Sequence, residues 1–532
     1  MSPKTKTPTK SELVQLQKLY KTDEKIGERL GGVPSYLVAY WRRKKNVPKY
    51  SLPKFSDREI LTLWERYGDD EKCGMELGIS KAAFYNWRRR YDIREKPAFL
   101  KLEQLELHFP GLRVSSLSQS LFNEQTIAQK ILARASDEDR VKVGSMVKVE
   151  PDLVAVNIGA GEVISEFNKT SQGYVWNAGK IILNEGYRLK AASSNGMSTG
   201  EFIRRQGIKT VYDLREGNSS QVLLEKGHLI PGQLILGSER SVIAFGCVGA
   251  FAIPVSPEEA ARTWAEGKIE IEVPATIQVE LIGRRSRGVS ARDIASAVVA
   301  ALDKDVCAGK VIEFHGLAVS PLSVSERFTL CLMTHLLGAR AAICPYNSTV
   351  RRYLTGRTLT RFAPVQPDKN AIYENRVELN ISEIRPAIYS LKEGIDLKTV
   401  RGLEGRAVSQ VVLGTCANGR FEDLRIAADI LKGNTVHPDC RLFICPASRS
   451  VYLEALKKGL IRVFVESGAM VINPGSESSM VHDGSWFSDS ETTLTNSIEP
   501  MPGGDVYYCS PATAAASALN ATITDPARYV KR

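Results

Sequence analysis

The stretch VVLGTCANGRFEDLR, residues 411–425, passes from an apolar strand-like segment through a polar turn into a charged helix-like segment. A strand that leads through a short turn into a helix is a building unit of layered α/β folds. Cys416 stands in the turn. The residues around it leave three roles open for Cys416: a metal ligand, a nucleophile, or a small residue at a tight corner.

The same alternation continues on the N-terminal side of this stretch. The β-branched runs TIQVELIG (276–283) and VIEFHGLAV (311–319) alternate with helical patterns such as DIASAVVAAL (293–302). This order of elements predicts layered α/β domains. We expect two such domains in residues 125–390 and a third in residues 391–532.

Longer motifs in this region resemble one known family. They are TIAQKILAR (126–134), LLEKGHLIPGQLILG (223–237), VIEFHGLAVSPLSVSERFTLCLMTHLLGARA (311–341), GTCANGRFEDLRIAADILKG (414–433) and CSPATAAASALNATITDP (509–526). In this order they resemble the large subunit of 3-isopropylmalate dehydratase, and so the aconitase superfamily. The resemblance covers most of the chain and implies an α/β fold with aconitase-like three-layer α/β/α domains.

The resemblance also bears on Cys416. In that family an iron–sulfur cluster with four irons is held by three thiolates, and the matching motif implies that Cys416 supplies the first. Ser476 and Ser479, in INPGSESSMV, stand where the family has the other two cysteines. A serine hydroxyl is a poor ligand for such a cluster because its pKa is far above that of a thiol. We therefore expect no cofactor, and we interpret Cys416 as a corner thiol that holds no metal.

Other positions depart from the family in the same way. The family's Asp-His pair falls on Gly186 and Tyr187, and its Asp-Ser-His triplet falls on residues 239–241, whereas Arg327 and Thr329 of a later motif are kept. The missing histidines predict a pocket without catalysis. It could bind a di- or tricarboxylate through its arginines, or it could be a collapsed polar pocket with no ligand. The candidate pocket residues are Tyr187, Arg188, Lys190, Glu239, Arg240, Asn418 and Arg420.

The first hundred residues differ from the rest in charge and contain a repeat. They hold 22 Lys and Arg against 13 Asp and Glu, so +9 of the total net charge of +11 lies there. The segments YKTDEKIGERLGGVPSYLVAYWRRKK (20–45) and YGDDEKCGMELGISKAAFYNWRRRY (67–91) match each other. Each predicts three helices with a Gly-centred turn, the pattern of a helix-turn-helix. We expect one small all-α unit in residues 1–50, a second in residues 51–98, and a linker in residues 99–124.

A basic tandem helix-turn-helix predicts duplex DNA as a partner, although two helical bundles with solvated basic faces would show the same pattern. Both copies resemble the helix-turn-helix of many bacterial regulators. We expect Asp23 and Asp70 to cap the middle helices, and Ser35 and Ser80 to cap the third helices. The start of each third helix would contact bases and its end would contact phosphates. The candidate DNA-binding residues are Ser35, Tyr36, Arg42, Arg43, Ser80, Lys81, Tyr85, Arg88, Arg89 and Arg90.

Composition bears on location and on other metals. The nine cysteines include no CxxC pair and the six histidines include no HxxxH group, so neither a disulfide framework nor a zinc site is expected. No apolar run reaches membrane-spanning length, and MSPKTKTPTK lacks the apolar core of a secretory signal. The chain is therefore expected in the cytoplasm, with no membrane partner.

Together these observations favour a non-catalytic aconitase-like protein that binds DNA as a regulator and senses a small carboxylate. No enzymatic activity is expected under this hypothesis. The alternative is a divergent hydro-lyase, a homologue of the dehydratase large subunit, that works with a separate small subunit. RNA is a third candidate partner, but A-form RNA hides the major groove that a helix-turn-helix reads. The sequence leaves the operator, the effector and the oligomeric state open.

Overall fold

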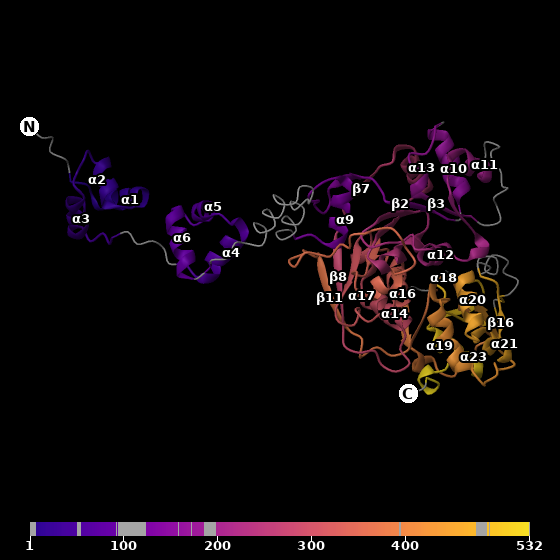
Figure 1. Ribbon diagram of the computed structural model, residues 1–532. Helices are drawn as coiled ribbons and strands as arrows, with labels where there is room; N and C mark the ends of the chain where they lie inside the picture. The colour runs from indigo at the N-terminus through magenta and orange to yellow at the C-terminus, as the bar shows by residue number, and fades with distance from the viewer. Residues whose placement is uncertain are drawn as a thin grey trace, which may run out of the picture. The chain divides into compact units, whose positions relative to one another are not determined.

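The computed structural model describes residues 7–49, 55–91, 93, 124–157, 159–171, 173–185, 198–392, 395–474, 487–488, 490–498 and 500–530. The chain divides into two compact units, Met1–Phe122 and Asn123–Arg532 (Figure 1). We call the second unit the body, and each unit is described by itself.

The first unit consists of two successive groups of three helices. The helices are α1 (Lys10–Tyr20), α2 (Asp23–Arg29), α3 (Ser35–Lys44), α4 (Asp57–Tyr67), α5 (Asp70–Glu76) and α6 (Lys81–Arg90). Each group has its own small core, with Trp41 buried in the first and Phe84 in the second. A glycine lies at the corresponding contact in both groups, since a Cβ on Gly27 would lie 2.0 Å from Val33 O and one on Gly74 would lie 2.8 Å from Ile79 O. The repeat therefore reflects two copies of the same helical packing.

The helix caps of this unit differ in part from those expected. The side chain of Ser80 accepts a hydrogen bond from Ala83 N and caps α6, which confirms that prediction. The predictions for the middle helices were wrong, because Thr22 caps α2 and Asp69 caps α5. Ser35 is the first residue of α3 and does not cap it. The aspartates that follow the true caps therefore serve another purpose, described below.

The first part of the body is a parallel five-stranded sheet with the strand order β4-β3-β2-β5-β6. Its strands are β2 (Leu153–Val156), β3 (Ile181–Glu185), β4 (Thr210–Asp213), β5 (Leu234–Gly237) and β6 (Phe251–Pro254). The helices of this part are α9 (Ile127–Ser136), α10 (Ala160–Thr170), α11 (Thr199–Gln206), α12 (Ser219–Glu225) and α13 (Pro257–Glu266), with the 3-10 helices η1 (Ala178–Lys180), η2 (Leu214–Glu216) and η3 (Arg240–Val248). A two-stranded antiparallel sheet pairs β1 (Met146–Val149) with β7 (Ile269–Glu272).

The second part is a parallel four-stranded sheet with the order β10-β9-β8-β11. Its strands are β8 (Thr276–Ile282), β9 (Val311–His315), β10 (Ala341–Ile343) and β11 (Asn375–Asn380). Its helices are α14 (Ala291–Ala301), α15 (Lys304–Cys307), α16 (Val324–Met333), α17 (Ser348–Leu354) and the 3-10 helix η4 (Thr334–Leu337).

The third part is a mixed seven-stranded sheet with the order β13-β12-β18-β17-β14-β15-β16. Its strands are β12 (Ala387–Ser390), β13 (Asp396–Thr399), β14 (Gln410–Gly414), β15 (Arg441–Cys445), β16 (Met470–Val471), β17 (Thr492–Thr495) and β18 (Asp505–Cys509). Its helices are α18 (Thr415–Asn418), α19 (Phe421–Leu431), α20 (Arg449–Lys457), α21 (Leu460–Glu466), α23 (Pro511–Asn520) and the 3-10 helices η5 (Val400–Leu403) and η6 (Pro526–Arg528).

Alternating side chains of β14 show why this sheet has helices on both faces. Val411 and Leu413 are buried in a core that includes residues of α19, α21 and α23. Val412 is buried in a different core, shared with residues of α14 and α16 from the second part. Successive side chains of a strand point to opposite faces, so an apolar run such as VVL predicts burial on both sides. The expected layered α/β architecture is confirmed, while the limits 125–390 and 391–532 stay a prediction.

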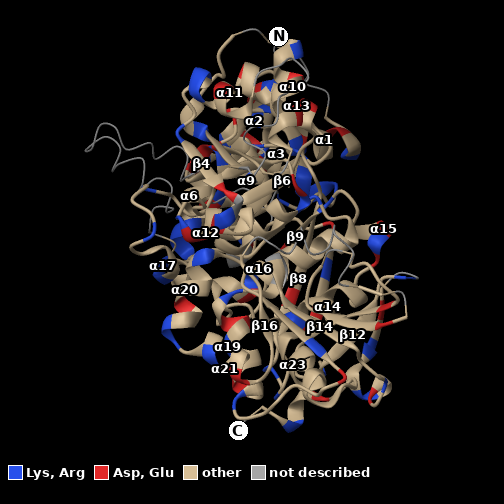
Figure 2. Cartoon of the chain, turned by 90° about the vertical axis from the view of Figure 1, so that its right-hand side faces the viewer, with Lys and Arg blue, Asp and Glu red and all other residues tan. Residues whose placement is uncertain are grey.

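Charge is mixed over the body. Figure 2 shows Lys and Arg interspersed with Asp and Glu along its helices. This matches the small excess of positive charge that remains once the first hundred residues are set aside. Within the described part of the chain, no helix is both long and apolar enough to span a bilayer.

Candidate functional site

The candidate site lies where strand order reverses among the parallel strands of two sheets. In the first sheet the chain runs outward from β2 to β3 and β4, and on the other side from β5 to β6. In the third sheet it runs from β14 to β15 and β16 on one side, and from β17 to β18 on the other. Loops at the carboxyl ends of such strands diverge, and the crevice between them is the usual binding position in open α/β sheets. Both reversal points carry polar residues.

Asn157 and Glu239 occupy the reversal point of the first sheet. Asn157 follows β2 directly, and its Nδ2 donates a hydrogen bond of 3.0 Å to Glu239 Oε2. Ser241 Oγ donates to the same carboxylate oxygen at 3.2 Å, and the Oγ atoms of Ser241 and Ser220 lie 2.9 Å apart. Glu239 is half-buried, whereas Asn157 is almost fully buried. These hydrogen bonds hold the Glu239 carboxylate in a fixed direction.

The turn after β14 has an unusual backbone. Gly414 has φ 124°, and a Cβ there would lie 1.9 Å from Cys445 O. Thr415 also has a positive φ, 68°, which is uncommon for a β-branched residue. Asn496, directly after β17, fixes the turn by accepting a hydrogen bond from Gly414 N at 2.7 Å and donating one to Asn418 O at 3.0 Å. Strain of this kind persists only where the surroundings hold it, and it is concentrated at functional sites.

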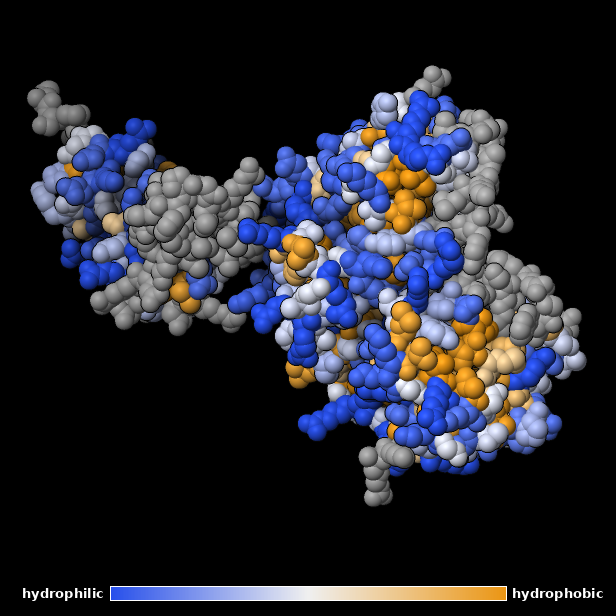
Figure 3. Space-filling view, turned by 45° about the vertical axis from the view of Figure 1, so that its right-hand side comes forward, coloured by the Kyte–Doolittle hydropathy of each residue, from blue (hydrophilic) through white to orange (hydrophobic). Residues whose placement is uncertain are grey.

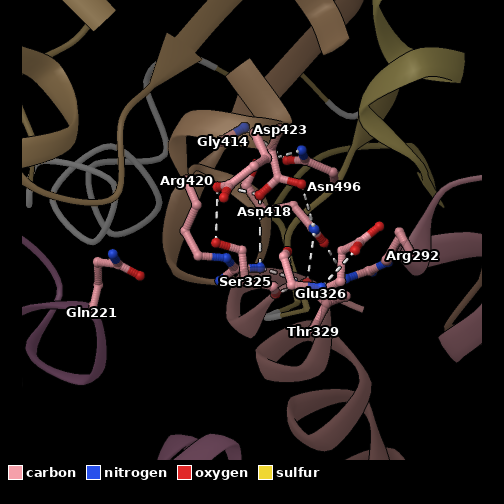
Figure 4. Close-up of polar contacts among 12 residues, drawn as sticks. Gln221, Arg292, Ser325, Glu326, Thr329, Gly414, Asn418, Arg420, Asp423 and Asn496 are labelled. Atoms are coloured by element: carbon pink, nitrogen blue, oxygen red, sulfur yellow. Dashed lines mark hydrogen bonds and ion pairs between the residues drawn. The ribbon is translucent and has the colours of Figure 1, made fainter. Parts of the chain in front are cut away.

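An ion pair between a buried arginine and a half-buried aspartate follows this turn (Figure 4). Arg420 is 1% exposed, and its Nη2 lies 3.6 Å from Asp423 Oδ2 and donates to Thr329 Oγ1. Asn418 Nδ2 donates to Asp423 Oδ1 and to Thr329 Oγ1, both at 3.0 Å. Burial raises the pKa of Asp423, although the Arg420 guanidinium and the Asn418 amide favour its ionised form. The network therefore holds the TCANGR turn against α16.

A second buried arginine reaches the turn from the second part of the body. Arg292 of α14 is 1% exposed and donates to Asn418 Oδ1 at 3.4 Å. It also donates to the Tyr389 hydroxyl and to Ser497 O, both at 2.7 Å. Figure 4 shows Arg292 and Arg420 on either side of Asn418 and Thr329. The amide of Asn418 thus connects residues from α14, α16 and α19.

The two reversal points are joined through α12. Gly217 pairs with Ser448 in an isolated bridge, and Asn218 N donates to Ala447 O at 2.9 Å. Ser448, which is fully buried, donates from Oγ to Glu225 Oε1 at 2.7 Å. Since α12 also carries Ser220, which contacts the Glu239 cluster, one short helix lies against both polar centres. This contact holds the edge of the third sheet against the first part of the body.

Several buried polar atoms of this region have no hydrogen-bond partner in the described part of the chain, and three of them are side-chain oxygens: Asn157 Oδ1, Gln221 Oε1 and Thr415 Oγ1. Buried polar atoms in folded proteins are nearly always satisfied by protein, water or ligand. One such atom lies at each reversal point and one lies on α12 between them, which is the pattern expected where a polar ligand or ordered water binds.

The structure brings some of the predicted pocket residues to this site. Asn418 and Arg420 are buried together, and Glu239 is part of the cluster at the first sheet. Arg240 is exposed at the start of η3. The other predicted residues fall outside what the structure describes: Tyr187, Arg188, Lys190, Ser476, Ser479 and the side chain of Cys416.

Sequence reasoning missed several residues of the site. Asn157, Gln221, Arg292, Asp423 and Asn496 were not proposed, although the structure places them at its centre. A signal existed for Asn157, because it is a single polar residue that follows an apolar strand directly. Asn496 follows the Thr-rich strand β17, and the other three sit on helices, where sequence alone does not indicate which polar side chains face inward.

Two of the arginines that were predicted to contact DNA form ion pairs inside the first unit. Arg42 is 5% exposed and donates to both carboxylate oxygens of Asp23 at 2.7 Å, and Arg88 pairs with Asp70 in the equivalent way. The assignment of Arg42 and Arg88 to phosphate was wrong, because these side chains fasten the third helix to the second. The remaining predicted residues are exposed: Ser35, Tyr36, Arg43, Ser80, Lys81, Tyr85, Arg89 and Arg90.

The described side chains offer no metal-binding group. In the ranges given above, no group of three or more His, Cys, Asp or Glu residues could hold a metal ion. The described residues therefore do not fit an iron–sulfur cluster by themselves.

Comparison with known proteins decides the family. A profile of the aconitase family (aconitate hydratase) matches residues 193–393 and 389–521. The chain is 36% identical over 417 residues to 3-isopropylmalate dehydratase large subunit 1 of Methanopyrus kandleri. The aligned residues cover 76% of this chain and 100% of that protein. This chain belongs to the aconitase family.

Further aconitase-family relatives agree with this. The large subunit 1 of 3-isopropylmalate dehydratase from Thermotoga maritima is 34% identical, over 76% of this chain and 100% of that protein. A probable methanogen homoaconitase large subunit of Methanosarcina mazei is 32% identical, over 68% of this chain and 95% of that protein. A crystal structure of aconitase X (holo-form) from Thermococcus kodakaraensis matches with a TM-score of 0.40 and 14% identity, covering 75% of this chain and 92% of that chain, and carries no argument about the site.

Family membership corrects three predictions. The hypothesis of a non-catalytic DNA-binding regulator that senses a carboxylate was wrong. The relatives that this chain matches along essentially their whole length are named as dehydratase large subunits. Duplex DNA and a carboxylate effector as partners are overturned by the same matches. The expectation of no cofactor is contradicted as well, because the family to which the chain belongs implies an iron–sulfur cluster.

Proposed function

We propose that this chain is the large subunit of a hydro-lyase that adds or removes water on a malate-type carboxylate, working with a separate small subunit. The observation that carries the proposal is the identity of 36% to a 3-isopropylmalate dehydratase large subunit over the whole of that relative. The polar residues at both reversal points support it, since they form a site where a small polar molecule could bind.

Glu239 is the proposed general base. Elimination of water requires a base that takes a proton from the carbon next to the one that loses hydroxide. The Glu239 carboxylate is half-buried, and hydrogen bonds from Asn157 and Ser241 hold it aligned. A fixed carboxylate at the edge of a parallel sheet is suited to this step because its orientation does not have to be set anew in each turnover.

Two arginines have different proposed roles. Arg240 adjoins Glu239 and is exposed, so its guanidinium can pair bidentately with a substrate carboxylate. Arg420 is buried and paired with Asp423, so we assign it a positioning role: it holds the turn that carries Cys416 and Asn418. Replacing Arg240 should therefore change KM, whereas replacing Arg420 should disturb the geometry of the site.

A small-subunit partner follows from the naming of the relatives as large subunits. Figure 3 shows hydrophobic surface on the body. The exposed apolar side chains on α20, α21 and β16 include Leu453, Leu456, Val465 and Met470. Exposed apolar patches mark interaction surfaces in soluble proteins. A cytoplasmic location is part of the proposal and rests on the family.

The test is a dehydratase assay on the assembled protein. The chain is purified under anaerobic conditions, with and without added iron and sulfide, and mixed with a dehydratase small subunit from the same genome. The substrates are 3-isopropylmalate and homocitrate, and the ultraviolet absorbance of the unsaturated product is followed. Turnover that requires both subunits supports the proposal. A stable complex of the two subunits without turnover of either substrate contradicts it.

A further inference from the structure

A pocket of about 300 Å³ lies between the second and third parts of the body, and its lining shares no residue with the polar centres described above. Its walls come from the loop between β8 and α14, the residues before β12, the end of β13 with η5, and the start of η6. The lining residues are Ser286, Arg287, Arg385, Pro386, Thr399, Val400, Arg401, Asp525 and Ala527. We call it the basic pocket.

Three arginines from three different segments meet there. Arg385 Nη1 donates to Ser286 Oγ at 3.3 Å and to Ser382 O at 3.0 Å, and Arg287 Nε donates to Val530 O at 2.9 Å. These uncharged acceptors orient the guanidinium groups without neutralising them. Arg401 Nε donates to Asp525 Oδ2 at 2.7 Å, and Asp525 is the acidic residue among the described lining residues. The lining therefore has three positive side chains against one negative side chain.

Asp525 does not cancel this excess. Burial by itself would raise its pKa, but the hydrogen bonds from Arg401 and from Ala527 N lower it below its ordinary value. Asp525 is thus ionised at neutral pH and paired with Arg401, which leaves the charges of Arg287 and Arg385 for another group. Like charges brought together in one concavity attract an anion.

The rest of the lining indicates what the anion is attached to. Pro386 and Val400 are buried, Ala527 is half-buried, and together they give the pocket an apolar part beside its charged rim. A phosphate group concentrates two negative charges and three acceptor oxygens at one point, which suits guanidinium groups converging from different segments. A dicarboxylate spreads the same charge over two separated groups.

We propose that the basic pocket binds a small organic phosphate, with the phosphate at Arg287, Arg385 and Arg401 and a short carbon chain against Pro386, Val400 and Ala527. This site is separate from the proposed hydro-lyase chemistry and does not rest on it. Its occupant connects segments of the second and third parts of the body, so binding also stabilises the folded body by mass action.

The experiment measures binding to the full chain by isothermal titration calorimetry, with inorganic phosphate, propyl phosphate and malonate as probes. We expect propyl phosphate to bind more tightly than inorganic phosphate, and both more tightly than malonate. Arg385→Gln is expected to weaken propyl phosphate binding by about tenfold to a hundredfold, because a hydrogen bond to a charged group is lost. Arg462→Gln, an exposed arginine on α21, is the matched control and is expected to bind as the natural chain does.

Arg401→Gln is the second variant, because the Arg401 side chain is 79% exposed and the glutamine amide is also a hydrogen-bond donor for the buried Asp525. If circular dichroism shows that Arg385→Gln does not fold, the affinity of Arg401→Gln for propyl phosphate tests the proposal instead. No binding of either phosphate by the natural chain would overturn the proposal. Unchanged affinity in the folded variants, or malonate binding as tight as that of propyl phosphate, would do the same. None of these results depends on dehydratase activity, so the two proposals fail independently.

Discussion

Asn157 and Glu239 meet at 3.0 Å across the point where the first sheet reverses its strand order. The amide follows β2, the carboxylate follows β5, and those strands are parallel neighbours. Such a contact fixes the direction of the carboxylate at the carboxyl edge of the sheet, where ligands of open α/β folds bind. It also provides a specific residue on which the proposed chemistry can be tested.

Replacing Glu239 by Gln tests its role as base. The amide keeps the size of the side chain and can still hydrogen-bond to Ser241, but it cannot accept a proton from carbon. We expect kcat of the assembled enzyme to fall by about 10²- to 10⁴-fold, with little change in thermal stability. Glu270→Gln, on an exposed position of β7, is the control. An E239Q enzyme with natural kcat would remove Glu239 from the mechanism.

The turn after β14 predicts that two glycine-to-alanine substitutions differ in their cost to stability. Gly414→Ala places a Cβ 1.9 Å from Cys445 O at φ 124°, so we expect a loss of about 3 kcal/mol or more in the free energy of unfolding. Gly405→Ala has a positive φ of 87° with no neighbouring heavy atom within 4 Å, and should cost about 1–2 kcal/mol. Urea unfolding of both variants measures the difference. Equal losses would show that the close approach at Gly414 is relaxed without cost.

His228 predicts a pH dependence of stability. Burial, with a smaller contribution from Lys226, lowers the pKa of His228 below 6.5, and its Nε2 lies 2.6 Å from the Tyr212 hydroxyl. Below about pH 6.5 the unfolded chain binds a proton at His228 that the folded chain does not, so the free energy of unfolding falls as the pH falls.

His228→Gln should reduce the difference in melting temperature between about pH 8 and about pH 5.5. His437→Gln, at a more exposed histidine, should leave that difference as it is in the natural chain. Differential scanning calorimetry at the two pH values gives the comparison. An identical pH dependence in the natural chain and in H228Q would contradict the assignment.

The buried pairs of the first unit predict a contrast between neighbouring arginines. Arg42→Gln removes the partner of Asp23 and leaves a partly buried carboxylate, so amide hydrogen exchange in α2 and α3 should quicken by about tenfold or more. Arg43→Gln, at an exposed position of the same helix, should leave exchange unchanged. Mass spectrometry of the full chain follows the exchange of both segments. Equal exchange in the two variants would mean that the Arg42–Asp23 pair does not hold the helices together.

The fold was predictable where apolar patterns determine it. The segment VVLG followed by a turn and FEDLRIAADIL predicts a strand and a helix, and the structure has β14 and α19 there. Alternate residues of such a strand must be buried on both faces, which requires helices on both sides of the sheet. The matching motifs then extended this local prediction to the whole body.

The site was less predictable because its contacts join residues that are distant in sequence. Arg292 reaches Asn418 over 126 positions, and Asp23 pairs with Arg42 over 19. The repeat held a usable signal for the second contact, since Asp and Arg recur together as Asp70 and Arg88. The basic ends of the third helices suggested DNA, but two of those arginines pair with half-buried aspartates and so contribute to packing.

Oxygen exchange tests the central proposal most directly. The assembled enzyme is incubated with 3-isopropylmalate in water enriched in ¹⁸O, and recovered substrate is examined by mass spectrometry. Reversible dehydration replaces the hydroxyl oxygen of the substrate with one from solvent. The proposal predicts recovered 3-isopropylmalate that carries one ¹⁸O when both subunits are present, and none with E239Q. Substrate recovered without label from the natural, fully assembled protein would contradict a hydro-lyase function.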